Sequence, residues 1–421
     1  MLAAACPGVF SPLQGRHMGF SPGWLTRSLR ATGLVCSLTL ACGMASAAPL
    51  QSVTVAVLSM AADARYAPKQ LERAYPDHPG GRVGDAVRMA AEDAALELQE
   101  LGLALKLKDV PLADAQALPK VLAELKGARV QHFVADLPPA MLTALVKAAP
   151  AALGGAMVIN VSSDRDALRN EACSAALLHT YPSRQMLTDA LAQYLAARNW
   201  RKLLLLQGPL PDDQLQGAAM ALSAKRYGLK ILQTKPFKLS GDPRERDLFN
   251  TRLLTNEREH DVVAVMDSHG EFARSLPYAT QWPRPVMGSN GLMAMAWHPQ
   301  WERNGGPQIS RRFYKLARRP MQSQDWAAWM AVKAIAAALV ADPKADVTQQ
   351  LKHLRAGEVV VDGNKGPGLT FRAWDGQLRQ PILLGHRDGV VGLAPLDGVL
   401  HPTEVMDTLG TDQKESKCQL R

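Results

Sequence analysis

Polar side chains that directly follow apolar runs are the strongest candidates for a ligand site in this sequence. Residues 261–266 are typical of a buried strand, and Asp267-Ser-His269 follows them. Ligands of parallel sheets bind beyond the carboxyl ends of the strands, so Asp267 and Ser268 are predicted to bind a ligand. The alternative interpretation is a helix cap, which requires no ligand. The sequence leaves both interpretations open.

A second apolar run, residues 156–161, ends in Ser162 and Ser163, which carry the same ambiguity. Their hydroxyl groups and backbone amides would suit a polar ligand, or a turn with no ligand. Further candidates for ligand binding are Ser59, Tyr181 and Asn290.

No motif in the sequence makes a convincing case for a catalytic site or a metal site. Gly19-Phe-Ser-Pro-Gly23 matches G-x-S-x-G in letters but does not lie between a strand and a helix. The chain contains no H-E-x-x-H, no cysteine pair at metal-binding spacing and no P-loop. Residues 363–368 are rich in glycine, but they follow no Rossmann strand and are interpreted as a turn. We therefore expect no catalytic residue, no metal and no cofactor, and a protein that is not an enzyme.

The elements that would position these side chains form a repeating pattern. Residues 53–58 are typical of an apolar strand, residues 81–101 of a helix with one apolar stripe, and residues 103–110 of a second strand. This order predicts a βαβ unit in a parallel sheet with both faces covered. A second copy of the pattern begins at residues 201–206. Two doubly wound α/β lobes are the predicted fold class.

The length, the apolar pattern and the charge of the chain agree with a globular protein. The chain has 421 residues, enough for two domains of ordinary size. Residues 325–340 are apolar nearly all round and predict a buried helix. The net charge of +9 is not gathered into a basic stripe with interleaved aromatic residues, so nucleic acid is not an expected partner.

The first 47 residues are predicted to be a secretory signal peptide. Arg27 and Arg30 form a basic region, and residues 31–44 form an apolar run too short to span a bilayer. Residues 45–47 (Ala-Ser-Ala) resemble a cleavage site, so the mature chain should begin at Ala48 and reside in the periplasm.

The cysteines bear on both anchoring and cross-linking. Lipid attachment at Cys42 is disfavoured because Thr39 stands where a lipobox requires leucine. Cys173 and Cys418 remain after cleavage, an even number in an oxidising compartment. We expect a disulfide between them, and two independent thiols are the alternative.

Several of these stretches together resemble a type I periplasmic solute-binding protein, of the leucine/isoleucine/valine-binding kind that serves ABC importers. The resemblance is carried by residues 84–93 (GDAVRMAAED), residues 326–335 (WAAWMAVKAI) and residues 370–380 (TFRAWDGQLRQ). Residues 179–194, with the last of these segments, are similar to the binding proteins associated with pyrroloquinoline quinone (PQQ)-dependent alcohol dehydrogenase systems.

The resemblance implies two lobes joined by a three-segment hinge, with a small-molecule ligand in the cleft between them. It also implies that the protein is a monomer and delivers its ligand to ABC permease subunits of the inner membrane. The alternative is a ligand-sensing receptor for a signalling partner. The implied domains are the signal peptide (1–47), lobe 1 (48–178 and 296–366), lobe 2 (179–295 and 367–400) and a C-terminal tail (401–421).

Two departures from the resemblance concern the ligand. The loop that holds a ligand carboxylate in the amino-acid binders is Asp136-Leu-Pro-Pro139 here, in which each proline removes one amide. Ser289-Asn290-Gly291 offers no carboxylate where those proteins pair the ligand ammonium. A buried ammonium without an anionic partner is unstable, so leucine, isoleucine and valine are disfavoured. The resemblance favours an alcohol, its oxidised acid or the quinone itself.

Overall fold

The structure is a computed structural model that describes residues 50–420. The predicted signal peptide, the G-x-S-x-G letters and Cys42 lie outside the described residues. None of the helices within residues 50–420 combines the length and hydrophobicity that a bilayer crossing requires.

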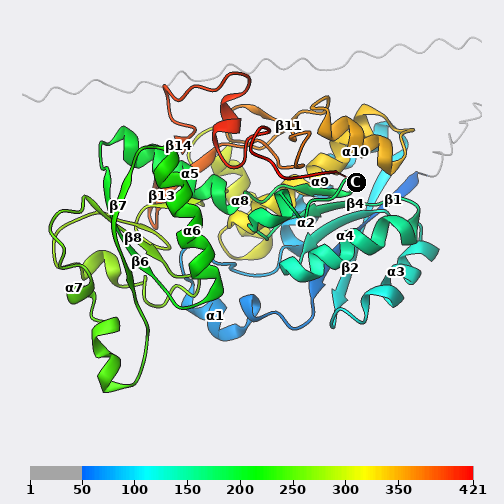
Figure 1. Cartoon of the computed structure of the whole chain (residues 1–421). Coiled ribbons are helices and arrows are strands. Elements are labelled where there is room, and N and C mark those ends of the chain that lie inside the picture. Colours follow the sequence, from blue (N-terminus) through cyan, green and yellow to red (C-terminus); the bar gives the residue numbers. More distant parts are fainter. Residues whose placement is uncertain (1–49, 421) are drawn as a thin grey trace, which may run out of the picture. The chain divides into compact units, whose positions relative to one another are not determined.

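The first sheet contains five parallel strands in the order β2-β1-β3-β4-β5 (Figure 1). Successive residues of β1 point to opposite faces, as the twofold repeat of a strand requires. Val55 and Val57 pack in one core and Ala56 and Leu58 in another. The strands are β1 (Gln51–Met60), β2 (Leu103–Leu112), β3 (His132–Asp136), β4 (Met157–Asn160) and β5 (Leu177–His179).

Helices cover both faces of this sheet. α2 (Gly84–Glu100) and α9 (Ser323–Ala341) pack against each other on the face of Val55 and Val57. α3 (Leu118–Gly127) and α4 (Pro139–Leu153) cover the other face. Buried side chains line nearly all of α9, as its all-round apolar pattern predicts. α8 (Gly306–Ala317) and α10 (Val347–Arg355) complete the helices packed on this core.

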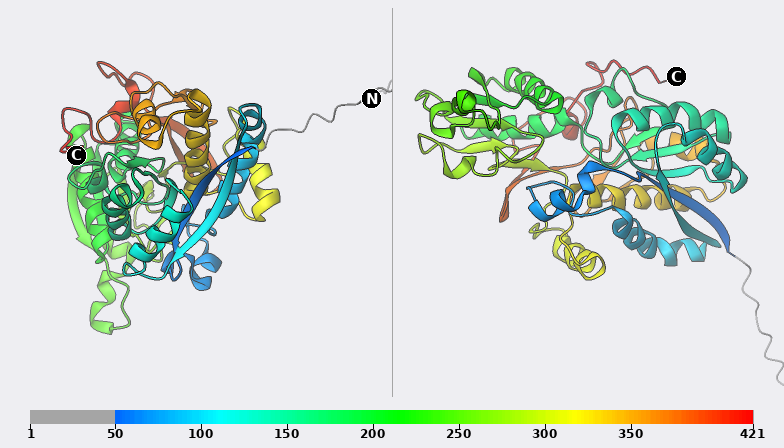
Figure 2. Two further views of the ribbon diagram at one scale, coloured as in Figure 1. Left: turned by 90° about the vertical axis from the view of Figure 1, so that its right-hand side faces the viewer. Right: turned by 90° about the horizontal axis from the view of Figure 1, so that it is seen from below.

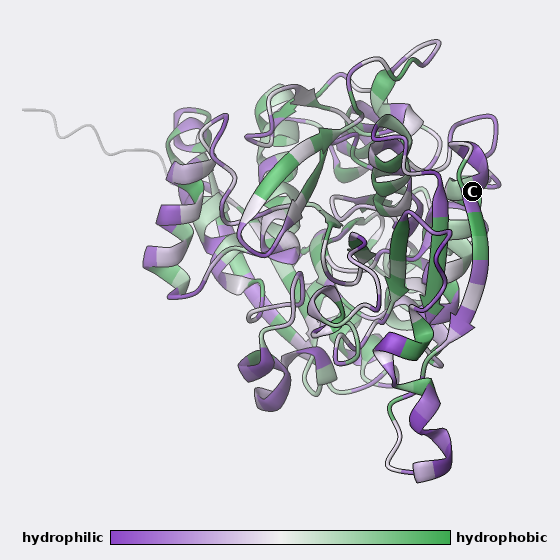
Figure 3. Cartoon of the chain, turned by 90° about the vertical axis from the view of Figure 1, so that its left-hand side faces the viewer, coloured by the Kyte–Doolittle hydropathy of each residue, from purple (hydrophilic) through white to green (hydrophobic). Residues whose placement is uncertain are grey.

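The second sheet contains four parallel strands in the order β7-β6-β8-β9. α5 (Arg184–Ala197) and α6 (Pro211–Arg226) cover one face, and Phe237 and Phe272 stack over the other. Strands in Figure 3 show both green, hydrophobic stretches and purple, hydrophilic ones. In this sheet, residues 203–206 and 262–266 are the buried apolar runs that the sequence predicts. The strands are β6 (Lys202–Gln207), β7 (Lys230–Pro236), β8 (Val262–Met266) and β9 (Val286–Gly288).

Shorter elements complete the fold. The strands β10 (Met293–Met295), β13 (Ile382–His386) and β14 (Gly389–Ala394) form an antiparallel sheet, and β11 (Val361–Asp362) pairs with β12 (Gly368–Leu369). Before β8 the chain forms the 3-10 turn η3 (Pro243–Leu248), which is followed by α7 (Thr251–Leu254). The other short helices are α1 (Pro68–Arg73), η1 (Ala64–Tyr66), η2 (Asp166–Arg169), η4 (Leu276–Tyr278) and η5 (Val405–Thr408).

Two chain segments cross side by side between the sheets. The Leu378 amide donates to the His179 carbonyl at 2.8 Å, and the His179 amide donates to the Gly376 carbonyl at 2.9 Å. The buried Gln377 side chain donates to the carbonyls of His179 and Tyr181. These bonds hold residues 177–184 next to residues 376–380. The exact lobe boundaries given by the resemblance remain a prediction.

The C-terminal tail is anchored to both halves of the chain. Cys418 forms a disulfide with Cys173, in the loop after β4. The Arg226 guanidinium of α6 donates to the Gly410 carbonyl at 2.7 Å. Asp407 is buried between Arg372 and Arg379, with Arg372 Nε 2.7 Å from its Oδ1. The tail is therefore part of the fold, although its sequence shows little pattern.

Candidate functional site

A cavity of about 190 Å³ lies beyond the carboxyl ends of β8 and β9. Asp267 and Ser268 follow β8, and Gly288 and Ser289 lie at the end of β9. Its sides are closed by the first half of α5, by Gln216 of α6, and by Met293 and Ala294 of β10. Its lining residues are Pro76, Asp77, His78, Asp164, Tyr181, Arg184, Leu187, Thr188, Leu191, Gln216, Met266, Asp267, Ser268, Gly288, Ser289, Met293 and Ala294.

One wall of this cavity comes from an insertion after β1, residues 61–82, which we call the strap. The strap contains η1 and α1 (blue in Figure 1), and its bends are visible from below in Figure 2. It reaches the loop after β8, where Arg73 and Tyr75 both bond to Glu271 and Gln70 lies 3.2 Å from His269. The strap therefore connects the first sheet to the ligand-facing edge of the second.

Gly270 allows this contact. Its φ of +86° lies in the left-handed region, and a Cβ there would come 3.0 Å from the Tyr75 ring. A larger residue would strain the backbone and push the strap away from the loop.

The strap also fills the corresponding edge of the first sheet. Asp136 ends β3 and is fully buried, with Arg65 Nη2 2.8 Å and the Tyr66 hydroxyl 2.5 Å from its carboxylate. Burial, together with the Asp136 charge, raises the pKa of Tyr66 far above its usual range. Ser59 is paired in register with Asp136 and lies outside the cavity. This edge is occupied by the protein's own side chains.

An ion-pair network bounds the cavity beside α5. Arg184 donates to Asp164 through two nitrogens, at 2.9 and 2.8 Å, and lies 3.3 Å from Asp212. Burial alone would lower the pKa of Arg184, but the neighbouring carboxylates outweigh it and the pKa is raised. The guanidinium is therefore a permanent cation whose charge is already balanced.

Asp77 is the most perturbed carboxyl group of the cavity. Ser323 donates a hydrogen bond to it, but burial dominates and raises its pKa to about 7. Its φ of +54° places it in the left-handed region, which aspartate and asparagine tolerate better than most residues. Burial likewise lowers the pKa of the adjacent His78, which is neutral at pH 7 as a result.

Tyr181 and Asp267 line the same cavity. Burial, and then the charges of Asp77 and Asp164, raise the pKa of Tyr181, so its hydroxyl stays protonated and available as a donor. One oxygen of Asp267 accepts from the Ala273 amide at 2.9 Å, six residues further along the loop after β8. The side chain of Asp267 therefore braces this loop, and it also borders the cavity.

The other predicted ligand residues lie elsewhere. Asn290 borders an adjoining cavity of about 530 Å³ that shares Asp77 with the first, and it is bonded to the Ala273 carbonyl at 3.0 Å. The Ser163 amide donates to the Asn160 side chain at 2.9 Å, within the turn after β4. The Ser162 hydroxyl is buried and has no hydrogen-bond partner among the described residues. The structure therefore brings Tyr181, Asp267 and Ser268 together, but not Ser59, Ser162 or Ser163.

Sequence reasoning missed Asp77, His78, Asp164, Arg184 and Gln216. Arg184 and Tyr181 lie within the segment that carries the narrower resemblance, residues 179–194, so that segment gave a usable signal. The polar strap gave none, because nothing in residues 61–82 shows that they reach the second sheet. The structure also supplies carboxylates, from Asp77 and Asp267, that residues 289–291 lack.

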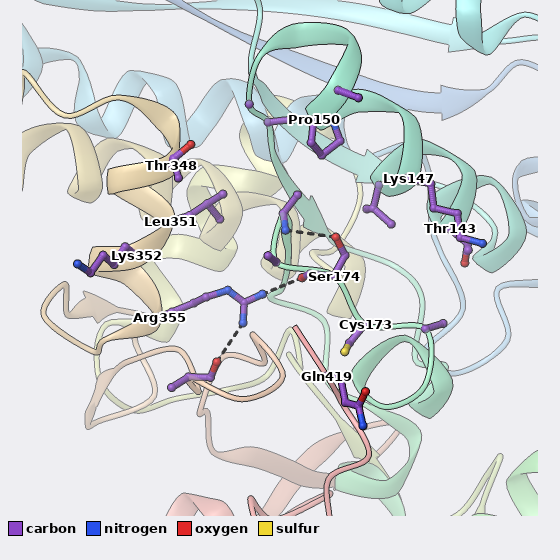
Figure 4. Close-up of a pocket in the computed structure, with 18 of the residues that line it drawn as sticks. Thr143, Lys147, Pro150, Cys173, Ser174, Thr348, Leu351, Lys352, Arg355 and Gln419 are labelled. Carbon is purple, nitrogen blue, oxygen red and sulfur yellow. Dashed lines mark hydrogen bonds between the residues drawn. The ribbon is translucent and has the colours of Figure 1, made fainter. Parts of the chain in front are cut away.

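A larger hollow, of about 1230 Å³, lies between α4, α10 and the loop that contains Cys173 (Figure 4). Arg355 projects into it and donates to the Ser174 carbonyl at 3.0 Å. The hollow borders Ala156 and Ala176, which precede β4 and β5, so it faces the amino ends of these strands. Ligands of parallel sheets bind at the opposite ends, so the smaller cavity is the better candidate. No group of three metal-ligating side chains occurs within residues 50–420.

Comparison with known proteins identifies the fold. No family model and no curated protein matches the sequence. Solved structures that match include an amino-acid ABC transporter substrate-binding protein from Pseudomonas fluorescens, with a TM-score of 0.66 and 13% identity over 88% of this chain and 99% of that one.

Two further structures show the same likeness. A leucine-, isoleucine-, valine-, threonine- and alanine-binding protein from Brucella ovis, in a closed conformation, has a TM-score of 0.66 and 11% identity over 88% of this chain and 99% of that one. An ABC transporter solute-binding protein from R. palustris, in complex with benzoate, has a TM-score of 0.60 and 12% identity over 88% of this chain and 100% of that one. The chain has the mixed α/β fold of the type I periplasmic binding proteins.

Proposed function

We propose that this protein is the periplasmic substrate-binding component of an ABC importer and binds a small solute in the cavity beyond β8 and β9. The observation that carries the proposal is the origin of the cavity walls. The strap extends from the first sheet, and Asp267 and Ser289 belong to the second. A solute in this cavity would therefore contact both α/β units, as a protein that closes around its ligand requires.

We also propose a link to PQQ-dependent alcohol oxidation, which follows from the narrower resemblance. The two segments that carry it, residues 179–194 and 370–380, meet in the structure. Gln380 Nε2 donates to the Thr180 carbonyl at 2.8 Å, beside the Leu378–His179 bond. Tyr181 and Arg184 of the first segment line the cavity. The shared sequence thus forms the crossing and one wall of the site, which supports a common role in ligand binding.

The proposal includes export, a monomeric state and inner-membrane permease subunits as partners. Export predicts that the N-terminal sequence of the periplasmic protein begins at or near Ala48. A chain that retains Cys42 with an attached lipid would contradict this.

The test is mass spectrometry of small molecules released when the natively purified protein is denatured. We expect a defined compound from the wild type and from Glu97→Gln, an exposed charge change on α2. Ser268→Trp would fill the cavity from a half-buried position, so the same compound should be absent from this variant. Equal release by all three proteins would contradict the assignment of the site, and turnover of the compound would contradict a binding role.

The identity of the partner protein distinguishes an importer from a sensor. We expect the ligand-loaded protein to stimulate a co-encoded permease and ATPase in proteoliposomes. Stimulation of a histidine kinase instead would establish the ligand-sensing receptor.

A further inference from the structure

We propose, on the basis of the proposed binding function and its site, that the ligand carries a protonated amine and no carboxylate, attached to a short apolar tail, and is not the alcohol, acid or quinone that the resemblance favours. The polar groups of the cavity are predominantly hydrogen-bond acceptors. Asp77 and Asp267 each have one oxygen engaged by the protein, Asp77 with Ser323 and Asp267 with Ala273. Gln216 Oε1 is buried and has no partner among the described residues. An ammonium group has three donors and no acceptor, so it complements these groups.

The charged donor and the backbone amides that could bind a carboxylate are already occupied, which leaves neutral side-chain donors such as the Tyr181 hydroxyl. Arg184, the one arginine or lysine that lines the cavity, is paired with Asp164 and Asp212. The Ser268 amide donates to Asp213 at 2.6 Å, and the Asp267 amide donates to the Ser289 hydroxyl at 2.8 Å.

Other backbone amides of the cavity lining are engaged in the same way. The amides of His78, Arg184, Gly288 and Ser289 donate to the carbonyls of Tyr75, Asp164, Leu292 and Val265, respectively. A ligand carboxylate would therefore displace existing bonds, and it would also face the negative charges of Asp77 and Asp267. Desolvating an anion without compensating bonds is unfavourable, so the cavity should reject acids.

The remaining side chains that line the cavity are apolar, and they determine which apolar tail of a ligand would fit. Leu187 and Leu191 of α5 face Met266, Met293 and Ala294 across a volume of about 190 Å³. A branched aliphatic or single aromatic tail is suited to this size. Methionine side chains adapt to differently shaped partners, so the tail is less strictly specified than the head group.

The proposal also predicts that ligand binding depends on pH, through the protonation of Asp77. Its pKa of about 7 in the free protein would fall when a cation binds, so binding would release a proton. The affinity for an amine should rise from pH 6 to pH 8 and level off above. The titratable groups that line the two cavities together with Asp77 are Glu72, Arg73, Tyr75, His78, Asp164, Tyr181, Arg184, Asp267, Arg274, Tyr278, His298, His386 and Arg387.

Burial lowers the pKa of His78 and of His298 and raises that of Tyr181, so the titrations of these three neighbours are shifted away from that of Asp77.

The test uses probes that share a skeleton and differ in charge. One series is isopentylamine, 3-methylbutan-1-ol and leucine, and the second is 2-phenylethylamine, 2-phenylethanol and phenylacetate. We expect calorimetry at pH 8 to show each amine binding at least about tenfold tighter than its alcohol and its carboxylate-bearing partner. Leucine contains the isopentylamine skeleton plus a carboxylate, so this pair isolates the cost of the acid group.

Asp77→Asn assigns the effect to one side chain. Asparagine retains an acceptor for Ser323 and tolerates the left-handed backbone, so the variant should fold. We expect about tenfold weaker amine binding, loss of the pH dependence, and less than about threefold change for the alcohols. Glu97→Gln removes the same charge far from the cavity lining and should bind as the wild type does.

Tighter binding of leucine or phenylacetate than of the matched amine would overturn this inference and leave the proposed function intact. Absence of binding by both amines would overturn it as well. The proposed function would fail separately, if the wild type and Ser268→Trp released the same small molecules.

Discussion

The two parallel sheets end in different ways at their carboxyl edges. In the first sheet, Asp136 is buried and bonded to Arg65 and Tyr66 of the strap, so the edge is filled. In the second sheet, Asp267 and Ser289 border a cavity. Both edges are places where a parallel sheet can hold a ligand. The difference shows that an insertion can decide which of two equivalent edges remains available.

The largest effect should come from the disulfide, which tests whether the two regions unfold together. Replacing Cys173 and Cys418 with serine opens a loop of 245 residues and should destabilise the protein by about 5–6 kcal/mol in the chain-entropy model. We expect one calorimetric transition in the wild type and a lower midpoint in the variant. Two free thiols in the unreduced, denatured wild type would contradict the prediction.

The filled edge should depend on its buried carboxylate for stability. Asp136→Ala leaves Arg65 and Tyr66 without their shared partner and should cost about 2–3 kcal/mol, reduced by the partial exposure of Arg65. Tyr66→Phe removes one hydrogen bond and should cost about 1 kcal/mol. Denaturant unfolding measures both values. A Tyr66→Phe loss as large as that of Asp136→Ala would show that the Tyr66 hydroxyl, and not the pairing of the carboxylate with Arg65, holds this edge.

The cavity edge should show the opposite behaviour, because Asp77 is kept there at the expense of stability. Its folded pKa of about 7 lies above the value in an unfolded chain, so its contribution is fully present at low pH and is lost as the pH rises through 7. Asp77→Asn should therefore raise the melting temperature of the ligand-free protein at pH 8 and have little effect at pH 4. Thermal unfolding at the two pH values is the measurement, and an equal change at both would contradict it.

The smallest effect should come from the contact that joins the two edges. Glu271→Gln weakens its bonds to Arg73 and Tyr75 but leaves the strap anchored by Arg65 and Tyr66. Partly exposed ion pairs contribute little, so the melting temperature should change by no more than about 1–2 °C. Ligand dissociation should become faster, which stopped-flow displacement would measure. Unchanged dissociation would show that the strap does not restrict access to the cavity.

The sequence predicted the parts of the fold that depend on local pattern. Residues 53–58 and 261–266 lie in or next to β1 and β8, and the all-round apolar run at 325–340 lies in the buried α9. The spacing of apolar residues indicates which side chains are buried, and burial is what these elements have in common.

The site was less accessible to sequence reasoning, because it depends on contacts between distant residues. Asp77 and Asp267 line one cavity although 190 positions separate them. Nothing in residues 61–82 indicates that Tyr66 occupies the place beside Asp136, where Ser59 was expected to meet a ligand. The residue types of the strap do not reveal which surface it covers.

The anchored C-terminal tail has a consequence for the order in which the molecule can be completed. Asp189 of α5 is buried and accepts from the Gly410 amide at 2.8 Å, and Asp407 is enclosed by Arg372 and Arg379. Gly410 follows Asp189 by 221 positions, and Asp407 follows Arg372 by 35. A chain in which residues 407–410 have not yet docked would hold both arginines without this carboxylate, and Asp189 without one of its donors. Complete pairing of these buried charges therefore requires the tail to be in place, which makes its docking a late step in folding.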